Sequence, residues 1–282
     1  MVSDHPSTVS VVIPCFNQGR FLAGAIESAL AQEGVQVQLL VINDGSTDET
    51  RDVAARFAHR VVVIDQSNQG LAAARNVGLA LATGEYAALL DADDRLEPAF
   101  AARMITACRE HECDFAYCDF HRMDPVGNII ATERLTGSKV ARNLASGLMH
   151  GGLFPPVCVL GRRAAFEPLP LGMDGHADYA LWLKLSLAGR CFVHVPEALV
   201  RYCDHPASMS RDALHMELSW QAALAEAARC HPHEFFAAVQ GLQKEFNALL
   251  HLTRYAPPLN RGAWNTRLRR VWRKLGRFWA RP

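Results

Sequence analysis

The feature that most constrains the fold is an alternation of short apolar runs with segments of helical periodicity, over roughly the first 120 residues. The runs are rich in Val, Ile and Leu and fall at Val9–Pro14, Val37–Ile42, Val61–Ile64, Tyr86–Leu90 and Phe115–Phe120. Between them, apolar side chains recur at helical spacing. Because the connections are short, the pattern predicts an α/β fold whose mostly parallel sheet is covered by helices on both faces.

Glycine, proline and helix-capping residues set the expected helix limits in this part of the chain. We expect helices over residues 21–30, 46–57, 70–82 and 98–108. Ser46 and Glu49 stand three residues apart, which predicts a capping box at the start of the second helix. Gly70 opens the third helix and Pro98 begins the fourth.

The regularity weakens after Asp124. We expect a turn over 125–128, helices over 140–149 and 178–187, and short strands over 191–195 and 199–202. From about Asp212 the pattern is helical to the end of the chain. We therefore divide the chain into one domain over 1–211, with parts 1–123 and 124–211, and a helical C-terminal region over 212–282.

Composition favours a globular chain with a substantial core, because 50% of the residues are hydrophobic and 21% are charged. The formal net charge is zero, which argues against nucleic-acid binding. The charge is unevenly placed, since residues 261–282 hold eight Lys or Arg and no Asp or Glu. That excess of basic residues predicts an interaction tail.

The eight cysteines lack the paired spacing of a zinc site. We expect buried free thiols in a reducing compartment rather than a disulfide framework. No apolar run reaches the ~18 residues that would indicate a membrane-spanning helix, and residues 1–7 do not resemble a signal peptide. These features favour a cytoplasmic protein.

Four short segments with candidate ligand-binding residues lie at the ends of the expected strands: Pro14–Asn17, Asn43–Ser46, Asp65 and Asp91–Asp94. In open parallel sheets, ligands bind beyond the carboxyl ends of the strands. The sequence therefore predicts a ligand site at this edge. Asp44 is placed there to accept hydrogen bonds from a base or ribose, although its segment can also be a simple turn.

The acidic cluster Asp91-Ala92-Asp93-Asp94 carries the clearest chemistry. Asp91 and Asp93 are alternate residues, which face the same way in an extended segment. Two neighbouring carboxylates repel each other unless a cation lies between them, and Mg²⁺ or Mn²⁺ would also accept phosphate oxygens. The alternative is a solvated turn that caps the next helix, with Asp94 as the cap.

Four segments carry a family resemblance, in order along the chain: Val9–Asn17, Val41–Asp48, Asn68–Gly78 and Gly84–Asp94. Together they resemble glycosyltransferase family 2, which has the GT-A fold. The resemblance implies a metal-dependent enzyme that transfers a sugar from a nucleotide-sugar donor, usually a UDP-sugar. It further implies inversion at the anomeric carbon and β-linked products.

The resemblance also implies residue roles. It implies donor binding by Pro14, Phe16, Asn17, Asp44, Arg75 and Asp91. Asp44 would contact the base, Arg75 the pyrophosphate or the acidic cluster, and Asp91 the ribose or sugar. Asp93 would hold a divalent metal, Mn²⁺ or Mg²⁺.

A second group of matches lies further along the chain. Residues 178–185 resemble the helix that follows a Glu-Asp pair in the family, which makes Asp178 the catalytic base. Ala177 replaces the Glu of that pair, so Asp174 is the fallback. Residues 201–210 resemble a segment in which a His joins the metal or the phosphates, which points to His205.

The resemblance implies a glycan or lipid-linked acceptor, and a role in cell-envelope or polysaccharide synthesis. In the tail, Trp264, Trp272 and Trp279 share a helical face while basic residues occupy the other. This pattern predicts contact with an anionic membrane surface. The alternative is that the tail packs on its own domain or on a second copy.

Two other functions compete with this one. A sugar-1-phosphate nucleotidyltransferase also uses a parallel α/β domain with metal-bound carboxylates, but it would show a Gly-rich loop with basic residues after the first strand. Residues 14–20 hold one glycine before Arg20. A non-catalytic nucleotide-sugar-binding relative is the second alternative, and Ala177 keeps it open.

Overall fold

The computed structural model describes residues 6–135, 140–141, 144–149, 154–173, 175–206 and 208–241. The strands are β1 Ser7–Cys15, β2 Val35–Asp44, β3 Val62–Gln66, β4 Tyr86–Leu89, β5 Arg95–Leu96, β6 Phe115–Met123, β7 Ile129–Glu133, β8 Val140–Ala141, β9 Val159–Arg162 and β10 Phe192–Cys203. The labelled α-helices are α1 Gly19–Leu30, α2 Thr50–Ala55, α3 Leu71–Leu81, α4 Phe100–Glu110, α5 Ala145–Met149, α6 Ala177–Leu187 and α7 Ala213–Cys230, and residues 232–241 are also helical. Short 3₁₀ turns are η1 Pro156–Cys158, η2 Arg163–Ala165 and η3 Met209–Arg211.

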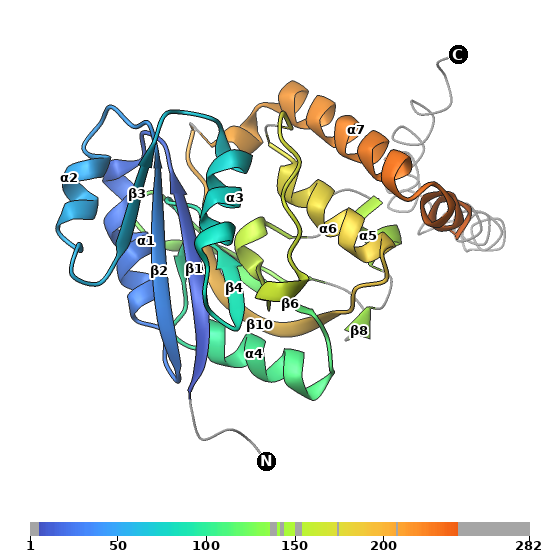
Figure 1. The fold of residues 1–282 in the computed structure, drawn as a ribbon, viewed down its shortest axis with the longest axis horizontal. Helices are drawn as coiled ribbons and strands as arrows, with labels where there is room; N and C mark the ends of the chain where they lie inside the picture. The colour runs from blue at the N-terminus through green and yellow to red at the C-terminus, as the bar shows by residue number, and fades with distance from the viewer. Residues whose placement is uncertain are drawn as a thin grey trace, which may run out of the picture.

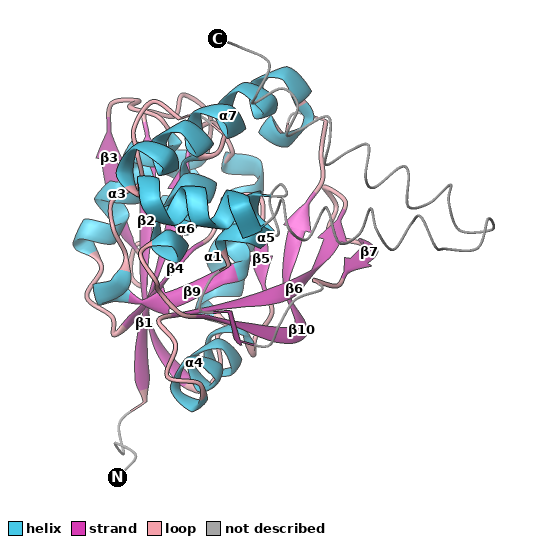
Figure 2. Cartoon of the chain, turned by 90° about the vertical axis from the view of Figure 1, so that its right-hand side faces the viewer, coloured by secondary structure: helices cyan, strands magenta, loops and turns pink. Residues whose placement is uncertain are grey.

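The strands form one curled sheet in the order β3-β2-β1-β4-β9-β6-β10-β5, with β7 beside β6 and β8 beside β10 (Figures 1 and 2). The pairs among β1, β2, β3 and β4 are parallel, as expected. β9 then inserts antiparallel between β4 and β6, and β6 is parallel to β10. The predicted α/β class is confirmed, but the parallel character belongs mainly to the first half of the chain.

Helices cover both faces of the sheet, because β1 and β2 alternate their side chains between two cores. Val11 and Leu39 pack with α1, α2 and α4 on one face. Val12 and Leu40 pack with α3, α6 and α7 on the other. A Cβ on Gly78 would lie 2.1 Å from a methyl carbon of Val12, so glycine at this position lets α3 approach β1 closely.

Several predicted element limits need correction. The two expected strands over 191–202 form the single strand β10, with bulges against β6 between Val195 and Val200. The helix expected over 140–149 is the short α5, preceded by β8. The helix expected from Pro98 starts at Phe100. The Phe100 backbone amide donates to the Glu97 carbonyl, so residues 97–100 form a turn that precedes the helix.

One cysteine prediction is wrong. Cys113 and Cys191 form a disulfide with Cα atoms 4.7 Å apart, although their sequence spacing of 78 residues gave no sign of a pair. They meet because Cys113 precedes β6, Cys191 precedes β10, and these strands are parallel neighbours. The other six cysteines are free thiols, as expected, and Cys230 is the only one of them that is not buried.

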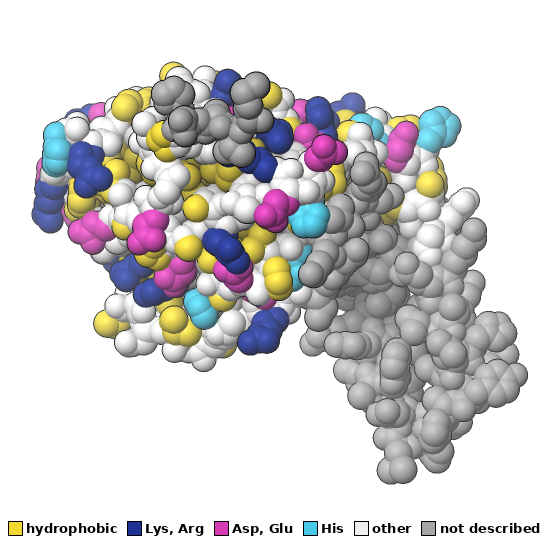
Figure 3. All heavy atoms as spheres, turned by 90° about the horizontal axis from the view of Figure 1, so that it is seen from below, with side chains coloured by type: hydrophobic (Ala, Val, Ile, Leu, Met, Phe, Trp, Pro, Cys, Tyr) yellow, Lys and Arg dark blue, Asp and Glu magenta, His cyan; other side chains and the backbone are white. Residues whose placement is uncertain are grey.

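None of the described helices has the length and apolar character needed to cross a bilayer. On the face shown in Figure 3, acidic and basic side chains of the described residues are interspersed, with no large field of one sign. The basic segment at 261–282 lies outside the described residues, as does the region after 241 that we expect to be helical.

Candidate active site

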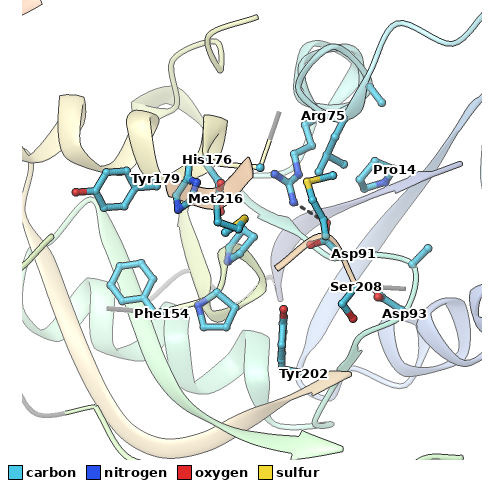
Figure 4. Close-up of a pocket in the computed structure, with 18 of the residues that line it drawn as sticks. Pro14, Arg75, Asp91, Asp93, Phe154, His176, Tyr179, Tyr202, Ser208 and Met216 are labelled. Carbon is cyan, nitrogen blue, oxygen red and sulfur yellow. Dashed lines mark hydrogen bonds and ion pairs between the residues drawn. The ribbon is translucent and has the colours of Figure 1, made fainter. Parts of the chain in front are cut away.

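A cavity of about 840 Å³ opens beyond the carboxyl ends of β1, β2 and β4 (Figure 4). Seven of the residues predicted for the site line it: Pro14, Phe16, Asp44, Arg75, Asp91, Asp93 and Asp178. Asn17 and His205 are not in the lining: Asn17 is the exposed neighbour of Phe16, and His205 Nε2 lies 2.9 Å from Asp93 Oδ2. The sheet topology thus brings together residues that are up to 164 positions apart in sequence.

Asp44 ends β2 and is almost fully buried, with 3% of its surface exposed. Its Oδ1 accepts hydrogen bonds from Gln66 Nε2 at 2.7 Å and the Gln69 amide at 2.9 Å, and its Oδ2 accepts from the Gly70 amide at 2.9 Å. Gly70 has φ +90°, a conformation that favours glycine. Asp44 therefore anchors the loop that starts α3, in addition to lining the cavity.

Asn17 joins the loops that follow β1 and β2. Its backbone adopts φ +52°, and its amide donates to Ser46 Oγ at 3.0 Å. Its Oδ1 accepts from the Thr47 amide at 2.8 Å. Asn17 thus ties the loop after β1 to the loop after β2, and its contact with a donor stays a prediction.

The predicted capping box is wrong. Ser46 makes its contacts with the β1 loop, and Glu49, at the cap position of α2, makes no side-chain cap hydrogen bond. Asp48 makes the contact at the start of α2 instead. Its Oδ1 accepts from the Thr50 amide at 3.0 Å, and its Oδ2 accepts from the Gly19 amide at 2.9 Å. One carboxylate therefore ties the start of α2 to the start of α1.

Arg75 projects from α3 into the charged end of the cavity and is 2% exposed. Its Nη2 donates to Asp91 Oδ1 at 2.6 Å, while its Nε has no hydrogen-bond partner among the described residues. Burial alone would lower the pKa of Arg75, but Asp91, Asp178 and Asp94 raise it above its ordinary value. A permanently charged guanidinium with a spare donor is suited to a diphosphate.

The acidic cluster separates into distinct environments. Asp93 Oδ2 lies 2.9 Å from His205 Nε2, and the imidazole stacks on Phe21 with ring centroids 5.2 Å apart. Asp94 is 1% exposed, and its Oδ1 accepts from the Cys203 amide at 2.8 Å. Asp94 thus holds the end of β10 against the cluster, and the predicted helix-capping alternative is not seen.

Burial also shifts the acid strengths of the cluster. It raises the pKa of Asp93, and repulsion from Asp91 adds to this. It raises the pKa of Asp94 well above its ordinary value, with Asp93 and Asp91 adding to the effect. Carboxylates crowded in this way bind a cation favourably, because a positive charge relieves their repulsion.

The donor chemistry of Asp93 and His205 fits a divalent metal only in part. The described residues hold no group of three or more His, Cys, Asp or Glu side chains arranged for a metal ion. Mg²⁺ and related ions are commonly held by one or two carboxylates together with substrate phosphates and water, rather than by a complete protein cage. Asp91 and Asp93, with His205 beside them, meet that smaller requirement.

Asp178 lies in the first turn of α6 and is partly exposed to the cavity. Burial raises its pKa, Arg75 opposes the shift, and Asp91 adds to it. The nearby backbone amide of Tyr179 and the imidazole of His176 also oppose the rise. The fallback residue Asp174 lies outside the described residues.

The other half of the cavity was missed in the sequence. It is lined by aromatic and apolar side chains, including Leu148, Phe154, Pro155, Tyr179, Trp182, Tyr202, Met209 and Met216. Figure 4 shows Phe154 and Tyr179 on the side opposite Pro14 and Arg75, with Tyr202 directed into the space between. The adjacent Pro155 and Pro156 are a local sign of a turn, but no sequence motif connects the segments that form this half.

Known proteins give a consistent picture. Residues 10–169 match the family described as Glycosyl transferase family 2. The uncharacterized glycosyltransferase YibD of Escherichia coli K12 is 34% identical over 139 residues, which are 47% of this chain and 40% of YibD. Glycosyltransferase GlyA of Streptococcus pneumoniae is 25% identical over 224 residues, covering 72% of this chain and 31% of GlyA. The chain therefore spans less than half the length of these relatives.

Solved structures share the fold. Residues 1–349 of Staphylococcus aureus TarS, in complex with UDP, superpose with a TM-score of 0.66 at 16% identity, covering 95% of this chain and 81% of that one. A mannosyltransferase from Pyrobaculum calidifontis, in complex with GDP-Man and Mn²⁺, gives 0.65 at 15% identity, covering 99% and 89%. The cavity at the strand ends, the curled sheet and the family match agree: the chain belongs to glycosyltransferase family 2.

Proposed function

We propose that the protein transfers a sugar from a UDP-sugar to an acceptor hydroxyl with inversion at the anomeric carbon. The observation that carries this proposal is the placement of Arg75, Asp91, Asp93 and Asp178 around one cavity. It provides a cationic group for a diphosphate and a separate carboxylate for an acceptor within the same space. Family membership supports sugar transfer over the nucleotidyltransferase alternative.

Donor binding is assigned to the charged half. Asp44 would meet the base from the fixed end of β2, with Pro14 and Phe16 lining the same end. Phe16 is 47% exposed, so its ring is free to pack against a ligand. A uridine donor is supported by TarS, whose solved complexes hold UDP and UDP-GlcNAc. GDP-Man in the mannosyltransferase shows that related folds accept another base.

A divalent ion, Mn²⁺ or Mg²⁺, would be held by Asp93 with His205, and when bound it would supply positive charge to the leaving diphosphate. The metal is supported by the Mn²⁺ complex of the related mannosyltransferase. Arg75 contributes charge of its own, because its pKa stays above the ordinary value in the buried site. Fixed positive charge that faces a developing anion lowers the barrier to its departure.

Asp178 would act as general base. It removes the proton from the acceptor hydroxyl as the oxygen attacks the anomeric carbon and the bond to the diphosphate breaks. The attack comes from the side opposite the leaving group, which inverts the configuration. A base with a raised pKa is better matched to neutral pH than an ordinary aspartate. The burial of Asp178 raises its pKa in this way.

The acceptor is a glycan or lipid-linked hydroxyl in this proposal, which suits a role in envelope or polysaccharide synthesis. A non-catalytic relative would bind the donor but not turn it over. The two are separated by UDP release from a panel of UDP-sugars, measured with Mn²⁺ or with a chelator. Metal-dependent release that Asp178→Asn abolishes supports the enzyme. UDP binding with no release from any donor would contradict it.

The stereochemistry has its own readout. Proton NMR of the product distinguishes a β-linkage from an α-linkage by the coupling constant of the anomeric proton. An α-linked donor should give the β-linked product. An α-linked product would overturn the single-displacement mechanism while leaving donor binding intact.

A further inference from the structure

The apolar half of the cavity contains an aromatic ring that is held from behind. Phe154 stacks on Tyr117 with ring centroids 4.8 Å apart and planes 23° apart. Tyr117 is 2% exposed and stacks in turn on His194, at 5.0 Å and 18°. One face of the half-buried Phe154 ring is therefore fixed, and the ring lines the cavity as Figure 4 shows.

The stack is anchored by a buried carboxylate. His194 Nε2 lies 2.8 Å from Asp119 Oδ1, and both side chains are less than 9% exposed. The same Asp119 oxygen accepts the Leu135 amide at 2.8 Å, and Leu135 also lines the cavity. A single buried network thus supports two separate parts of the wall, and nothing in the proposed chemistry uses it.

A buried hydrogen-bond donor lies on the same side of the cavity. Trp182 is 2% exposed and lines the cavity, yet its Nε1 has no hydrogen-bond partner among the described residues. It stands four residues after Asp178 on α6, which places both side chains on one face of the helix. An unsatisfied buried N–H is unfavourable unless a ligand or water completes it.

The charge in this half is largely neutralised by internal pairing. Arg122 pairs with Asp204, and Asp204 also accepts from Arg211 at 2.6 Å. Arg134 reaches the lining but lies in an exposed position beside Glu133. The wall therefore offers ring faces and a neutral donor more than it offers cations for a phosphate.

We propose that this wall is an acceptor subsite for a neutral pyranose ring, which stacks on the face of Phe154 that is turned away from Tyr117. The proposal rests on the proposed function, since it takes Asp178 as the base. The electron-rich ring face attracts the weakly positive C–H face of a sugar, and a ring already held in place loses little freedom on binding. Trp182 Nε1 would donate to a sugar hydroxyl, leaving another hydroxyl for Asp178.

Saturation-transfer NMR on the full chain loaded with UDP and Mg²⁺, which is diamagnetic, tests this without turnover. The probes are methyl β-glucopyranoside, methyl β-galactopyranoside and N-acetylglucosamine, with glycerol 3-phosphate and ribitol 5-phosphate as anionic, non-pyranose rivals. We expect saturation of the C–H protons on one face of at least one pyranose. Phe154→Ala should reduce that signal at least fivefold, Phe154→Tyr should retain it, and Trp182→Phe should weaken it.

Phe236→Ala is the matched control, because this aromatic ring is 60% exposed and does not line the cavity. His194→Ala tests the support: it should weaken the pyranose signal while UDP still binds with wild-type affinity. Binding of the anionic polyols in place of the pyranoses, or a pyranose signal that Phe154→Ala leaves unchanged, would overturn the subsite. If the wild-type chain did not bind UDP at all, the proposed function itself would be overturned.

Discussion

The two halves of the cavity are held together by different forces. In the charged half, Asp44 and Arg75 each hold a fixed position through hydrogen bonds or an ion pair at 2.9 Å or less. In the aromatic half, Phe154, Tyr117 and Trp182 are positioned by ring packing. The comparison teaches that the charged half should be sensitive to changes of charge, and the aromatic half to changes of shape.

The largest expected effect is a loss of turnover on substitution of Asp178, which lies between the two halves. Asp178→Asn removes the base while keeping the size of the side chain, so turnover should fall by about 10³-fold, within the range for general-base catalysis. UDP affinity should stay within about twofold, because donor binding is assigned to the other half. The measurement is steady-state UDP release together with UDP titration.

Asp52→Asn is the matched control, since Asp52 is an exposed carboxylate on α2. It should leave turnover unchanged. Near-normal turnover by Asp178→Asn would show that Asp178 is not the base. The division between a donor-binding half and a half where the acceptor reacts would then be wrong.

The next effect concerns stability of the charged half. Asp44→Ala removes three hydrogen bonds that this nearly buried carboxylate accepts, from Gln66, Gln69 and Gly70, so the free energy of unfolding should fall by about 3 kcal/mol. Asp52→Ala is the comparison, because Asp52 is exposed in the first turn of α2 and should contribute under about 1 kcal/mol. Urea denaturation of both variants measures the difference. Equal losses would mean that Asp44 is not the anchor.

A pH dependence follows from Asp94. Burial raises the pKa of Asp94, so the folded state holds its proton more tightly than the unfolded state. The free energy of unfolding should therefore fall as pH rises from about 4 through the raised pKa. Asp94→Asn keeps an acceptor for the Cys203 amide but cannot ionise, so its stability should fall less over that range.

Urea denaturation at several pH values from 4 to 8 checks this, with Asp52→Asn as the control for a carboxylate at the surface. Asp93 and Asp178 should leave a residual slope in the variant, because burial raises their pKa values too. A variant with the same pH profile as the wild type would show that Asp94 ionises normally.

The smallest effect is expected in the aromatic half. Tyr179 donates its hydroxyl to the Leu148 carbonyl at 2.7 Å in a buried position. Tyr179→Phe keeps the ring and removes that hydrogen bond, so the free energy of unfolding should fall by about 1 kcal/mol. A loss as large as that of Asp44→Ala would show that this one hydrogen bond anchors the aromatic half as strongly as Asp44 anchors the charged half.

Most of the charged half could be predicted from sequence because its carboxylates follow strands within short, contiguous motifs, whereas Arg75, which lies on α3, was pointed to by the family resemblance. Pro14, Asp44 and Asp91 needed only the rule that ligands bind at the carboxyl ends of parallel strands. The limits of that approach appear at Ser46, whose spacing from Glu49 suggested a capping box. Its hydroxyl instead accepts from Asn17, a contact across 29 positions.

The aromatic half could not be predicted, because its members come from separate segments that meet only in the folded chain. Phe154 lies after α5, Tyr202 is in β10 and Met216 is in α7. β9 inserts antiparallel between β4 and β6, which the strand alternation did not signal. The Cys113–Cys191 disulfide depends on the parallel pairing of β6 and β10, which is equally non-local.

The most direct test of the account is a thermal-shift measurement with UDP, with and without Mn²⁺, on wild type and Asp93→Asn. A ligand that binds the folded state raises its stability by mass action. We predict that UDP raises the melting temperature of the wild type, that Mn²⁺ increases this shift, and that Asp93→Asn loses the increase while retaining its fold. A shift by UDP that is equal in both proteins and unaffected by Mn²⁺ would contradict a metal-assisted donor site at the acidic cluster.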